Sequence, residues 1–291
     1  MPEACERDAA AEPAVNSQPV GLRDLPLHDG RSIPQLGFGV WQVPDGEVAG
    51  AVRMASEAGY RLIDTAEGYG NERGVGEALS TLSAATTPLR VTTKLDANTF
   101  GYDAIRRAFD ASLARLGRER VDLYLIHWPR PSERRFRETW RTLRSIRDDG
   151  LAASIGVCNF EETHLRDIVE DSGEVPAVNQ IELHPWLPQT ALRAIHAELG
   201  IVTQAWSPLA SGALLSDPAL VALGDRLGAT PAQIVLRWHV ESGHAVLPKS
   251  VTPARIRANL ALNSFLLDED AHRVLASLES GERTGPHPDA F

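Results

Sequence analysis

The sequence predicts an α/β fold, a (β/α)8 barrel of the TIM type with an N-terminal β-hairpin. Short apolar runs alternate with stretches of helical spacing along the chain, which is typical of parallel α/β proteins. There are eight such runs, and eight parallel strands close into a barrel. No long linker interrupts the 291 residues, which favours one barrel over the alternative, an open doubly wound sheet.

The predicted elements follow one another in a regular order. Residues 1–20 are rich in Ala, Glu, Pro, Asn and Ser and predict a flexible tail before a single barrel domain at 21–291. Asp29-Gly30 is typical of the turn of a hairpin. The eight strands are expected at Leu36–Val40, Tyr60–Ile63, Arg90–Thr93, Leu123–Ile126, Ala153–Val157, Val178–Ile181, Val202–Ala205 and Ala245–Leu247.

Helix signals lie between the predicted strands. Apolar residues recur at helical spacing from Ala104 to Leu116, and Gly117 is placed to end that helix. Thr230 before a proline predicts the start of another helix. Acidic residues suit three further helix starts, at Asp45, at Glu161 with Glu162, and at Asp268.

The composition excludes several classes of protein. The apolar fraction of 43% and the charged fraction of 23% are ordinary for a globular domain. The net charge of −10 argues against nucleic acid and anionic membranes as partners. Cys5 and Cys158 lack CxxC spacing, and no signal peptide or membrane-spanning run is found. We therefore expect a cytoplasmic monomer that acts on a small molecule.

Lysine is scarce in this chain. Only two of the 29 lysine and arginine residues are lysine, Lys94 and Lys249, and each ends an apolar run. A compact ammonium can enter a tight site or act as a point charge on phosphate, where arginine acts differently. An arginine-rich coding bias explains the scarcity equally well. The residues around the two lysines therefore have to distinguish a functional role from this bias.

Polar and aromatic residues follow the predicted strands. In a barrel, the carboxyl ends of all strands meet at one rim, and that rim carries the working residues. We therefore expect a common pocket formed by Asp64, Lys94, His127, Trp128, Cys158, Asn159, Gln180, Glu182, His184, Trp206, Ser207, Lys249 and Ser250.

Four residues at this rim suit proton donation to an oxygen atom. The phenol of Tyr69 has an unperturbed pKa of about 10, and we expect Lys94 to lower that pKa by stabilising the phenolate. Asp64 would pair with Lys94 and keep it charged, and His127 would orient a carbonyl oxygen or share the proton. The set suits protonation of a developing alkoxide, as in carbonyl reduction.

The segment that follows the eighth predicted strand has the composition of an anion site. Lys249, Ser250 and Arg255 place two cations and a hydroxyl donor at a helix start. Arg257, on the same helix, is interpreted as a solvated surface charge.

Seven ordered motifs, read together, resemble the aldo-keto reductase family from about Leu22 to the C-terminus. They are Leu-Gly-Phe-Gly-Val-Trp at 36–41, Asp-Thr-Ala-Glu-Gly-Tyr-Gly-Asn-Glu at 64–72, Thr-Thr-Lys at 92–94, Asp-Leu-Tyr-Leu-Ile-His-Trp-Pro at 122–129, Ile-Gly-Val-Cys-Asn-Phe at 155–160, Asn-Gln-Ile-Glu-Leu-His-Pro at 179–185 and Leu-Pro-Lys-Ser-Val-Thr-Pro-Ala-Arg-Ile-Arg-Ala-Asn at 247–259. The chain resembles bacterial members that reduce diketo sugar acids and methylglyoxal.

The resemblance implies a barrel that binds NADPH in an extended form and reduces aldehydes or ketones by direct hydride transfer. It implies that Tyr69 is the proton donor, that Lys94 and Asp64 tune it, and that His127 orients the substrate. It assigns cofactor contacts to Trp41, Cys158, Asn159, Gln180, Trp206, Ser207, Leu209, Ser211, Lys249, Ser250, Val251, Thr252, Arg255 and Asn259. It assigns the substrate wall to Trp41 and Trp128, beside Tyr69 and His127.

Within this set the resemblance gives separate roles. Asn159 and Gln180 would hold the nicotinamide carboxamide, and Trp206 would stack on the nicotinamide ring. Lys249 and Arg255 would grip the adenosine 2′-phosphate, which favours NADPH over NADH. The loop with Ser207, Leu209 and Ser211 would cover the pyrophosphate, and Asn259 would contact the adenine.

Three positions depart from the family pattern, and two other functions stay open. Cys158 stands where many members have serine, Trp206 where many have tyrosine, and Ala258 where an acidic or amide side chain often contacts the adenine.

One alternative function is that of a non-catalytic, regulatory barrel that binds NADPH. The other is a metal-dependent barrel hydrolase with Glu182, His184 and His127 as ligands, although Lys94 would place a cation beside the metal; no metal site is predicted.

Overall fold

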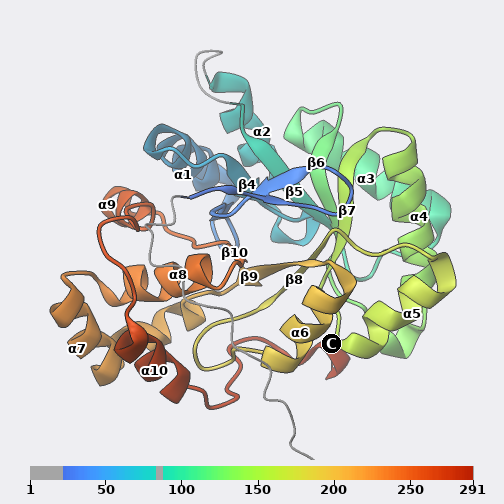
Figure 1. The fold of residues 1–291 in the computed structure, drawn as a ribbon. Helices are drawn as coiled ribbons and strands as arrows, with labels where there is room; N and C mark the ends of the chain where they lie inside the picture. The colour runs from blue at the N-terminus through green and yellow to red at the C-terminus, as the bar shows by residue number, and fades with distance from the viewer. Residues whose placement is uncertain (1–21, 83–87, 291) are drawn as a thin grey trace, which may run out of the picture.

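Eight parallel strands form one sheet, and helices cover its outer face (Figure 1). This computed structural model describes residues 22–82 and 88–290, so the predicted tail at 1–20 lies outside the described residues. Neighbouring strands are consecutive in the chain. In order they are β3 (Phe38–Gly39), β4 (Leu62–Asp64), β5 (Arg90–Leu95), β6 (Val121–Ile126), β7 (Ala152–Cys158), β8 (Val178–Glu182), β9 (Val202–Trp206) and β10 (Ala245–Val246).

The first and last strands of the sheet meet, which closes the barrel. Leu36 forms a parallel bridge with Val246. The backbone N–H of Gly37 donates to Val246 O at 3.0 Å, and Val246 N–H donates to Gln35 O at 2.8 Å. The predicted (β/α)8 barrel is therefore confirmed, and the open doubly wound sheet is excluded.

Helices connect successive strands on the outside of the barrel (Figure 1). Because each strand is buried between the barrel interior and this helical layer, most strand residues are buried and many are apolar. The helices are α1 (Asp45–Ala58), α2 (Glu72–Thr81), α3 (Tyr102–Leu116), α4 (Phe136–Asp148), α5 (Glu162–Ser172), α6 (Thr190–Leu199), α7 (Pro218–Leu227), α8 (Pro231–Glu241), α9 (Pro253–Ala258) and α10 (Glu269–Ser277). Short 3₁₀ turns are η1 (Glu67–Tyr69), η2 (Pro131–Glu133), η3 (Ala210–Ser216) and η4 (Pro288–Ala290).

Most predicted helix boundaries are confirmed by hydrogen bonds or backbone angles. Gly117 ends α3 with a φ of 62°, the left-handed conformation that glycine adopts readily. Thr230 caps α8 and accepts from the N–H of Gln233. Asp268 caps α10 by accepting from the N–H of Ala271 at 2.8 Å.

The N-terminal hairpin covers the amino ends of the barrel strands. Its strands β1 (Asp24–Pro26) and β2 (Ser32–Pro34) pair antiparallel. Asp24 accepts from Arg90, the first residue of β5, at 2.8 Å, and Asp29 accepts from Ser154 near the start of β7 at 2.6 Å. The hairpin therefore does not cover the opposite rim, at the carboxyl ends of the strands, where the predicted functional residues lie.

Buried apolar clusters lie inside the barrel and between its strands and helices. Leu62, Leu123, Leu125 and Val178 belong to a buried cluster with residues of the hairpin. A larger cluster joins the strands to the helices around them and includes the fully buried Trp140. None of the described helices is long and apolar enough to cross a membrane.

Candidate active site

Three elements bring Asp64, Lys94 and Tyr69 together. Asp64 is the last residue of β4, Lys94 lies near the end of the neighbouring β5, and Tyr69 ends the turn η1. Gly70, directly after the tyrosine, has a φ of 68°. This left-handed conformation is accessible to glycine, and it turns the chain back toward α2 so that η1 stays at the rim.

Lys94 is the centre of this cluster. Its ammonium donates to both carboxylate oxygens of Asp64, at 2.6 and 2.7 Å, and to the backbone oxygen of Thr65 at 2.9 Å. It also donates to the hydroxyl of Tyr69 at 3.2 Å. The lysine side chain is fully buried. All three ammonium hydrogens therefore have acceptors, which is required of a buried cation.

The ion pair with Asp64 keeps Lys94 charged. Burial acts against the charged form of Lys94, but the Asp64 carboxylate outweighs it and raises the pKa of the lysine above its usual value. For Tyr69, burial disfavours the phenolate and raises the pKa to about 12, although the nearby Lys94 acts in the opposite direction. Lys94 therefore acts on the tyrosine pKa in the predicted direction, but burial dominates and the net shift is upward, which the sequence did not predict.

His127 lies beside the tyrosine. It follows the last residue of β6, and its ring meets that of Tyr69 edge to face with centroids 5.6 Å apart. Burial, with the charge of Lys94 adding to it, lowers the pKa of His127 to about 3. The imidazole is therefore neutral at physiological pH and can donate one hydrogen bond. The ring of Trp128 lies 6.5 Å from that of His127.

Asn159 connects the backbone of His127 with the side chain of Trp206. The residue follows β7 and has a φ of 63°, a conformation that asparagine tolerates better than most residues. Its Nδ2 donates to the backbone oxygen of His127 at 3.0 Å, and its Oδ1 accepts from Trp206 Nε1 at 2.8 Å. The position of the indole ring is thus tied to the segment that carries His127.

The amide of Gln180 is engaged within the protein. Its Nε2 donates to Asp64 Oδ2 at 3.0 Å and to Gln204 Oε1 at 2.8 Å. Cys158 Sγ lies 3.8 Å from Gln180 Oε1, a weak contact, and accepts from Asn159 Nδ2 at 3.2 Å. The structure thus brings Cys158, Asn159 and Gln180 together at the rim, as predicted.

The loop after β9 has an unusual backbone. Ser207, Ala210, Ser211 and Gly212 all have positive φ, between 46° and 91°. Successive N–H groups in such conformations form concave anion-binding surfaces. The hydroxyls of Ser207 and Ser211 lie 3.4 Å apart, and Leu209 packs against two apolar clusters.

Two cations lie close to the start of α9. Lys249 and Arg255 are both exposed, and neither forms an ion pair with another described residue. Ser250 is nearly buried, and its hydroxyl accepts from the N–H of Thr252 at 3.1 Å. Asn259, one residue after α9, is 6% exposed. This arrangement leaves two cations available to a small anion.

Other predicted residues are less closely connected. Trp41 and Val251 are exposed, at 49% and 45%, and no hydrogen bond joins their side chains to the Lys94 cluster among the described residues. Glu182 and His184 lie 3.0 Å apart, but among described residues no group of three or more His, Cys, Asp or Glu is arranged to hold a metal ion.

Sequence reasoning missed two kinds of contact at this rim. The Thr65 backbone oxygen and the Gln204 side chain complete the surroundings of Lys94 and Gln180. The sequence predicts that the C-terminal tail, residues 281–291, forms part of the pocket mouth, and its segment 283–285 does reach the rim; the missed contact is its anchor, where Glu182 accepts from Thr284. The polar Gln204 inside the apolar run of β9 was the available signal for the first kind.

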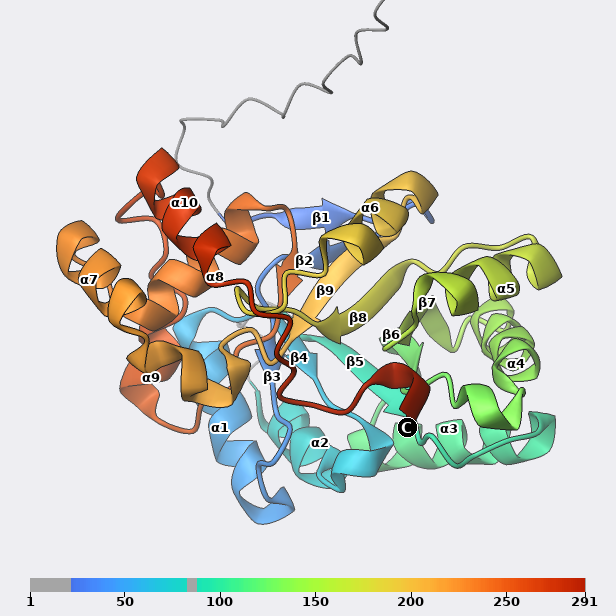
Figure 2. The same cartoon turned by 90° about the horizontal axis from the view of Figure 1, so that it is seen from below.

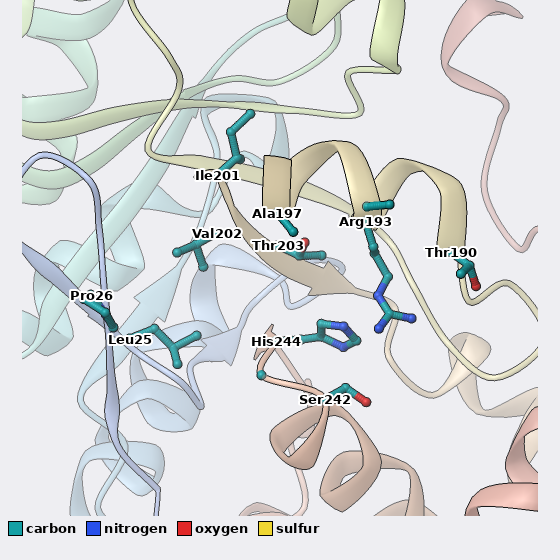
Figure 3. A pocket seen from close by; sticks show the side chains of 12 residues that line it. Leu25, Pro26, Thr190, Arg193, Ala197, Ile201, Val202, Thr203, Ser242 and His244 are labelled. Atoms are coloured by element: carbon teal, nitrogen blue, oxygen red, sulfur yellow. The ribbon is translucent and has the colours of Figure 1, made fainter. Parts of the chain in front are cut away.

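Two hollows of the described surface lie away from this cluster. The larger, of about 510 Å³, is lined by β1, α6, β9 and the turn between α8 and β10 (Figure 3). Arg193 and His244 point into it, and none of the predicted site residues lines it (Figure 3). The second, of about 290 Å³, lies between the hairpin and the strand starts.

Comparisons with known proteins agree with this geometry. Residues 35–280 match the aldo/keto reductase family. An aldo-keto reductase of Mycolicibacterium smegmatis is 49% identical over 92% of this chain and 97% of its own length. Methylglyoxal reductase DkgA of Escherichia coli strain K12 is 45% identical over 92% of this chain and 97% of its own.

Solved structures are similar over nearly the whole chain. A mutant of Gox0644 in complex with NADPH has a TM-score of 0.89 and 41% identity, covering 94% of this chain and 99% of its own. An aldo/keto reductase from Brucella melitensis has a TM-score of 0.84 and 46% identity, covering 89% and 100%.

The fold and the rim define a barrel oxidoreductase. The chain belongs to the aldo/keto reductase family. The predicted family and enzyme class are thereby confirmed.

Proposed function

We propose that this enzyme reduces small aldehydes and ketones with NADPH, and that Tyr69 is the general acid. The observation that carries the proposal is the contact of one buried ammonium with both partners: Lys94 Nζ lies 2.6 Å from Asp64 Oδ1 and 3.2 Å from the Tyr69 hydroxyl. NADPH is the cofactor that the sequence predicts, and the similar Gox0644 mutant has been solved with it.

The proton step follows from the charges at the rim. A pKa of about 12 keeps Tyr69 protonated at neutral pH, so its hydroxyl is ready to donate. As the carbonyl oxygen becomes an alkoxide, the proton passes to it from the Tyr69 hydroxyl. Lys94 then faces a phenolate, which its charge stabilises more strongly than the phenol. Asp64 keeps the ammonium in place throughout.

The neutral His127 has a different role in this proposal. With a pKa of about 3 it cannot supply the proton at physiological pH. A neutral imidazole can instead donate a hydrogen bond to the carbonyl oxygen, since its ring lies beside that of Tyr69. The proton and the orienting hydrogen bond then come from two different side chains.

The residues of the rim fit NADPH. When bound, this cofactor supplies the hydride. Lys249 and Arg255 are exposed cations without an ion pair to any other described residue, which suits a 2′-phosphate. Trp206 would pack on the nicotinamide, and Asn159 and Gln180 would hold its carboxamide. The positive-φ loop at 207–212 would cover the pyrophosphate.

Small carbonyl compounds are the proposed substrates. After Trp128, only the short turn η2 (Pro131–Glu133) separates the rim from α4, so the connection between β6 and α4 forms no long loop over the site. The likeness to methylglyoxal reductase DkgA suggests a 2-oxoaldehyde such as methylglyoxal as the first substrate to test.

The test is NADPH absorbance loss with methylglyoxal, with and without a metal chelator. We expect chelator-independent turnover, and Tyr69→Phe should lower kcat by about 10²–10⁴-fold while NADPH still binds. Tyr102→Phe is the matched control, since Tyr102 is 51% exposed on α3.

Unchanged kcat in Tyr69→Phe would show that Tyr69 is not the general acid. NADPH binding without any turnover would favour the regulatory alternative, and turnover abolished by chelator would favour a metal enzyme.

A further inference from the structure

The last residues of the chain cross the rim of the barrel. We call residues 280–290 the C-terminal strap, which runs from α10 over the strand ends toward the side of α4 and α5 (Figure 2). Its first two N–H groups, of Ser280 and Gly281, donate to Trp186 O at 3.1 and 2.9 Å. Near its end, Asp289 lies 3.4 Å from His164 Nε2. The strap is therefore fixed at both ends.

Glu182, the last residue of β8, holds the middle of the strap. Its side chain is fully buried, and its Oε1 accepts from the backbone N–H of Thr284 at 2.6 Å and from its hydroxyl at 2.7 Å. Its Oε2 accepts from the N–H of Gly285 at 3.3 Å. His184 Nε2 also lies 3.0 Å from Glu182 Oε1. Because a buried carboxylate is costly unless its oxygens are satisfied, the strap's donors and Glu182 stabilise each other at the rim.

Gly285 lies directly against the ring of Trp206. A Cβ added at Gly285 would be 2.4 Å from Cη2 and 3.2 Å from Cζ3 of the indole, the two atoms at the far side of its six-membered ring. No side chain fits between strap and ring without moving one of them. The opposite edge of the indole is fixed by its Nε1, which donates to Asn159 Oδ1 at 2.8 Å.

We infer that Glu182 and the C-terminal strap position the indole of Trp206, and that Gly285 is required at its position because residue 206 is tryptophan. Glu182 acts through Thr284 and Gly285 and is a positioning residue. The inference rests on the proposed function, in which Trp206 packs on the nicotinamide. Since Asn159 also donates to His127 O at 3.0 Å, the strap, the indole and the His127 segment form one connected unit.

A double-mutant cycle on the full-length enzyme tests the fit of strap and ring. Gly285→Ala should weaken NADPH binding about tenfold, because the methyl group displaces the indole. In a Trp206→Phe background the two far ring atoms are gone, so Gly285→Ala should change the NADPH Kd less than about twofold. Gly50→Ala is the control for the added methyl, because nothing lies within 4 Å of that position.

A second pair of variants tests the anchor. Thr284→Val removes the hydroxyl that donates to Glu182 and should raise the KM for NADPH several-fold. Thr284→Ser keeps that hydroxyl and should restore the wild-type KM. A role limited to stability would change the melting temperature and leave the KM of the folded enzyme unaltered, so both quantities are measured for each variant.

The outcomes separate the inference from the proposed function. If Trp206→Ala leaves NADPH affinity unchanged, the ring does not pack on the cofactor, and the proposed role of Trp206 fails together with the positioning role of the strap, while Tyr69 as general acid is tested separately by Tyr69→Phe. If Trp206→Ala weakens NADPH but Gly285→Ala has the same effect in the wild-type and Trp206→Phe backgrounds, or none in either, only the positioning role of the strap is overturned. Equal KM values for Thr284→Val and wild type would also overturn the role of the Glu182 anchor.

Discussion

Lys94 and Asp64 form a buried ion pair in which one ammonium contacts both carboxylate oxygens, at 2.6 and 2.7 Å. The two side chains are 0% and 4% exposed. A compact ammonium can make these contacts and still reach the Tyr69 hydroxyl at 3.2 Å. The broad, planar guanidinium of arginine has a different donor geometry. This explains why an arginine-rich chain has a lysine at this position.

Removing one partner of this pair should cost both activity and stability. Lys94→Met leaves the Asp64 carboxylate buried without its cation, which we expect to lower the free energy of unfolding by about 3–5 kcal/mol. Urea denaturation measures this loss, and NADPH consumption should fall by about two orders of magnitude or more.

A double variant separates the two effects. Lys94→Met with Asp64→Leu removes both charges and should recover much of the lost stability, because apolar replacement of a buried pair is often nearly neutral. Its activity should stay low. A double variant as unstable as Lys94→Met would show that the pair stabilises the fold beyond the cost of an unpaired charge.

The pH dependence of carbonyl reduction should be flat around neutrality. Reduction needs a protonated Tyr69 and, in our proposal, a neutral His127. Their pKa values of about 12 and about 3 put both groups in these forms across that range. We therefore expect kcat/KM to be constant between about pH 5 and pH 9. A fall in kcat/KM centred near pH 8 would show that Lys94 outweighs burial and lowers the pKa of Tyr69.

The fold could be predicted because its strands are buried on both faces. Each predicted apolar run overlaps a barrel strand, although the structure shortens the first to Phe38–Gly39 and the last to Ala245–Val246 and extends most of the others by one or two residues. Pairing between these two depends on closure of the barrel, which a local pattern does not contain. The meeting of Asp64 with Lys94 followed from the same rule, because both lie at strand ends.

The contacts between distant segments could not be predicted. Glu182 and Thr284 are 102 residues apart in the chain, and no periodic pattern links a buried carboxylate to a tail that returns over the rim. The sign of the Tyr69 pKa shift was also missed. The sequence shows that a cation is near, but the extent of burial, which dominates, depends on the packed structure.

Protonation of buried histidines should destabilise the enzyme in acid. Burial lowers the pKa of His196 to about 4 and that of His239 to about 3, against about 6.5 in an unfolded chain. Between these values the unfolded state binds the additional protons, so the free energy of unfolding falls as the pH falls from about 6.5 toward 4. Each histidine contributes about 1.4 kcal/mol per pH unit in this window.

His239→Phe tests this contribution by removing one of these groups. The slope of unfolding free energy against pH, measured with urea between about pH 4.5 and pH 6, should decrease by about 1.4 kcal/mol per pH unit. His28→Phe is the control, because His28 is exposed in the hairpin turn. An equal slope in wild type and His239→Phe would mean that His239 is protonated in the folded enzyme.

Cofactor preference should depend on Lys249. This exposed ammonium has no ion pair with another described residue, so Lys249→Met removes a charge without leaving a carboxylate unpaired. We expect NADPH affinity to fall about 10–100-fold, from the loss of one charge-assisted contact to the 2′-phosphate, while NADH affinity changes less than about threefold. Arg257→Met, on the short helix α9 that follows Lys249 and also exposed, should leave both affinities unchanged. Titration of each variant with NADPH and NADH measures both affinities. If Lys249→Met weakened the binding of NADPH and NADH equally, Lys249 would contact a part of the cofactor other than the 2′-phosphate.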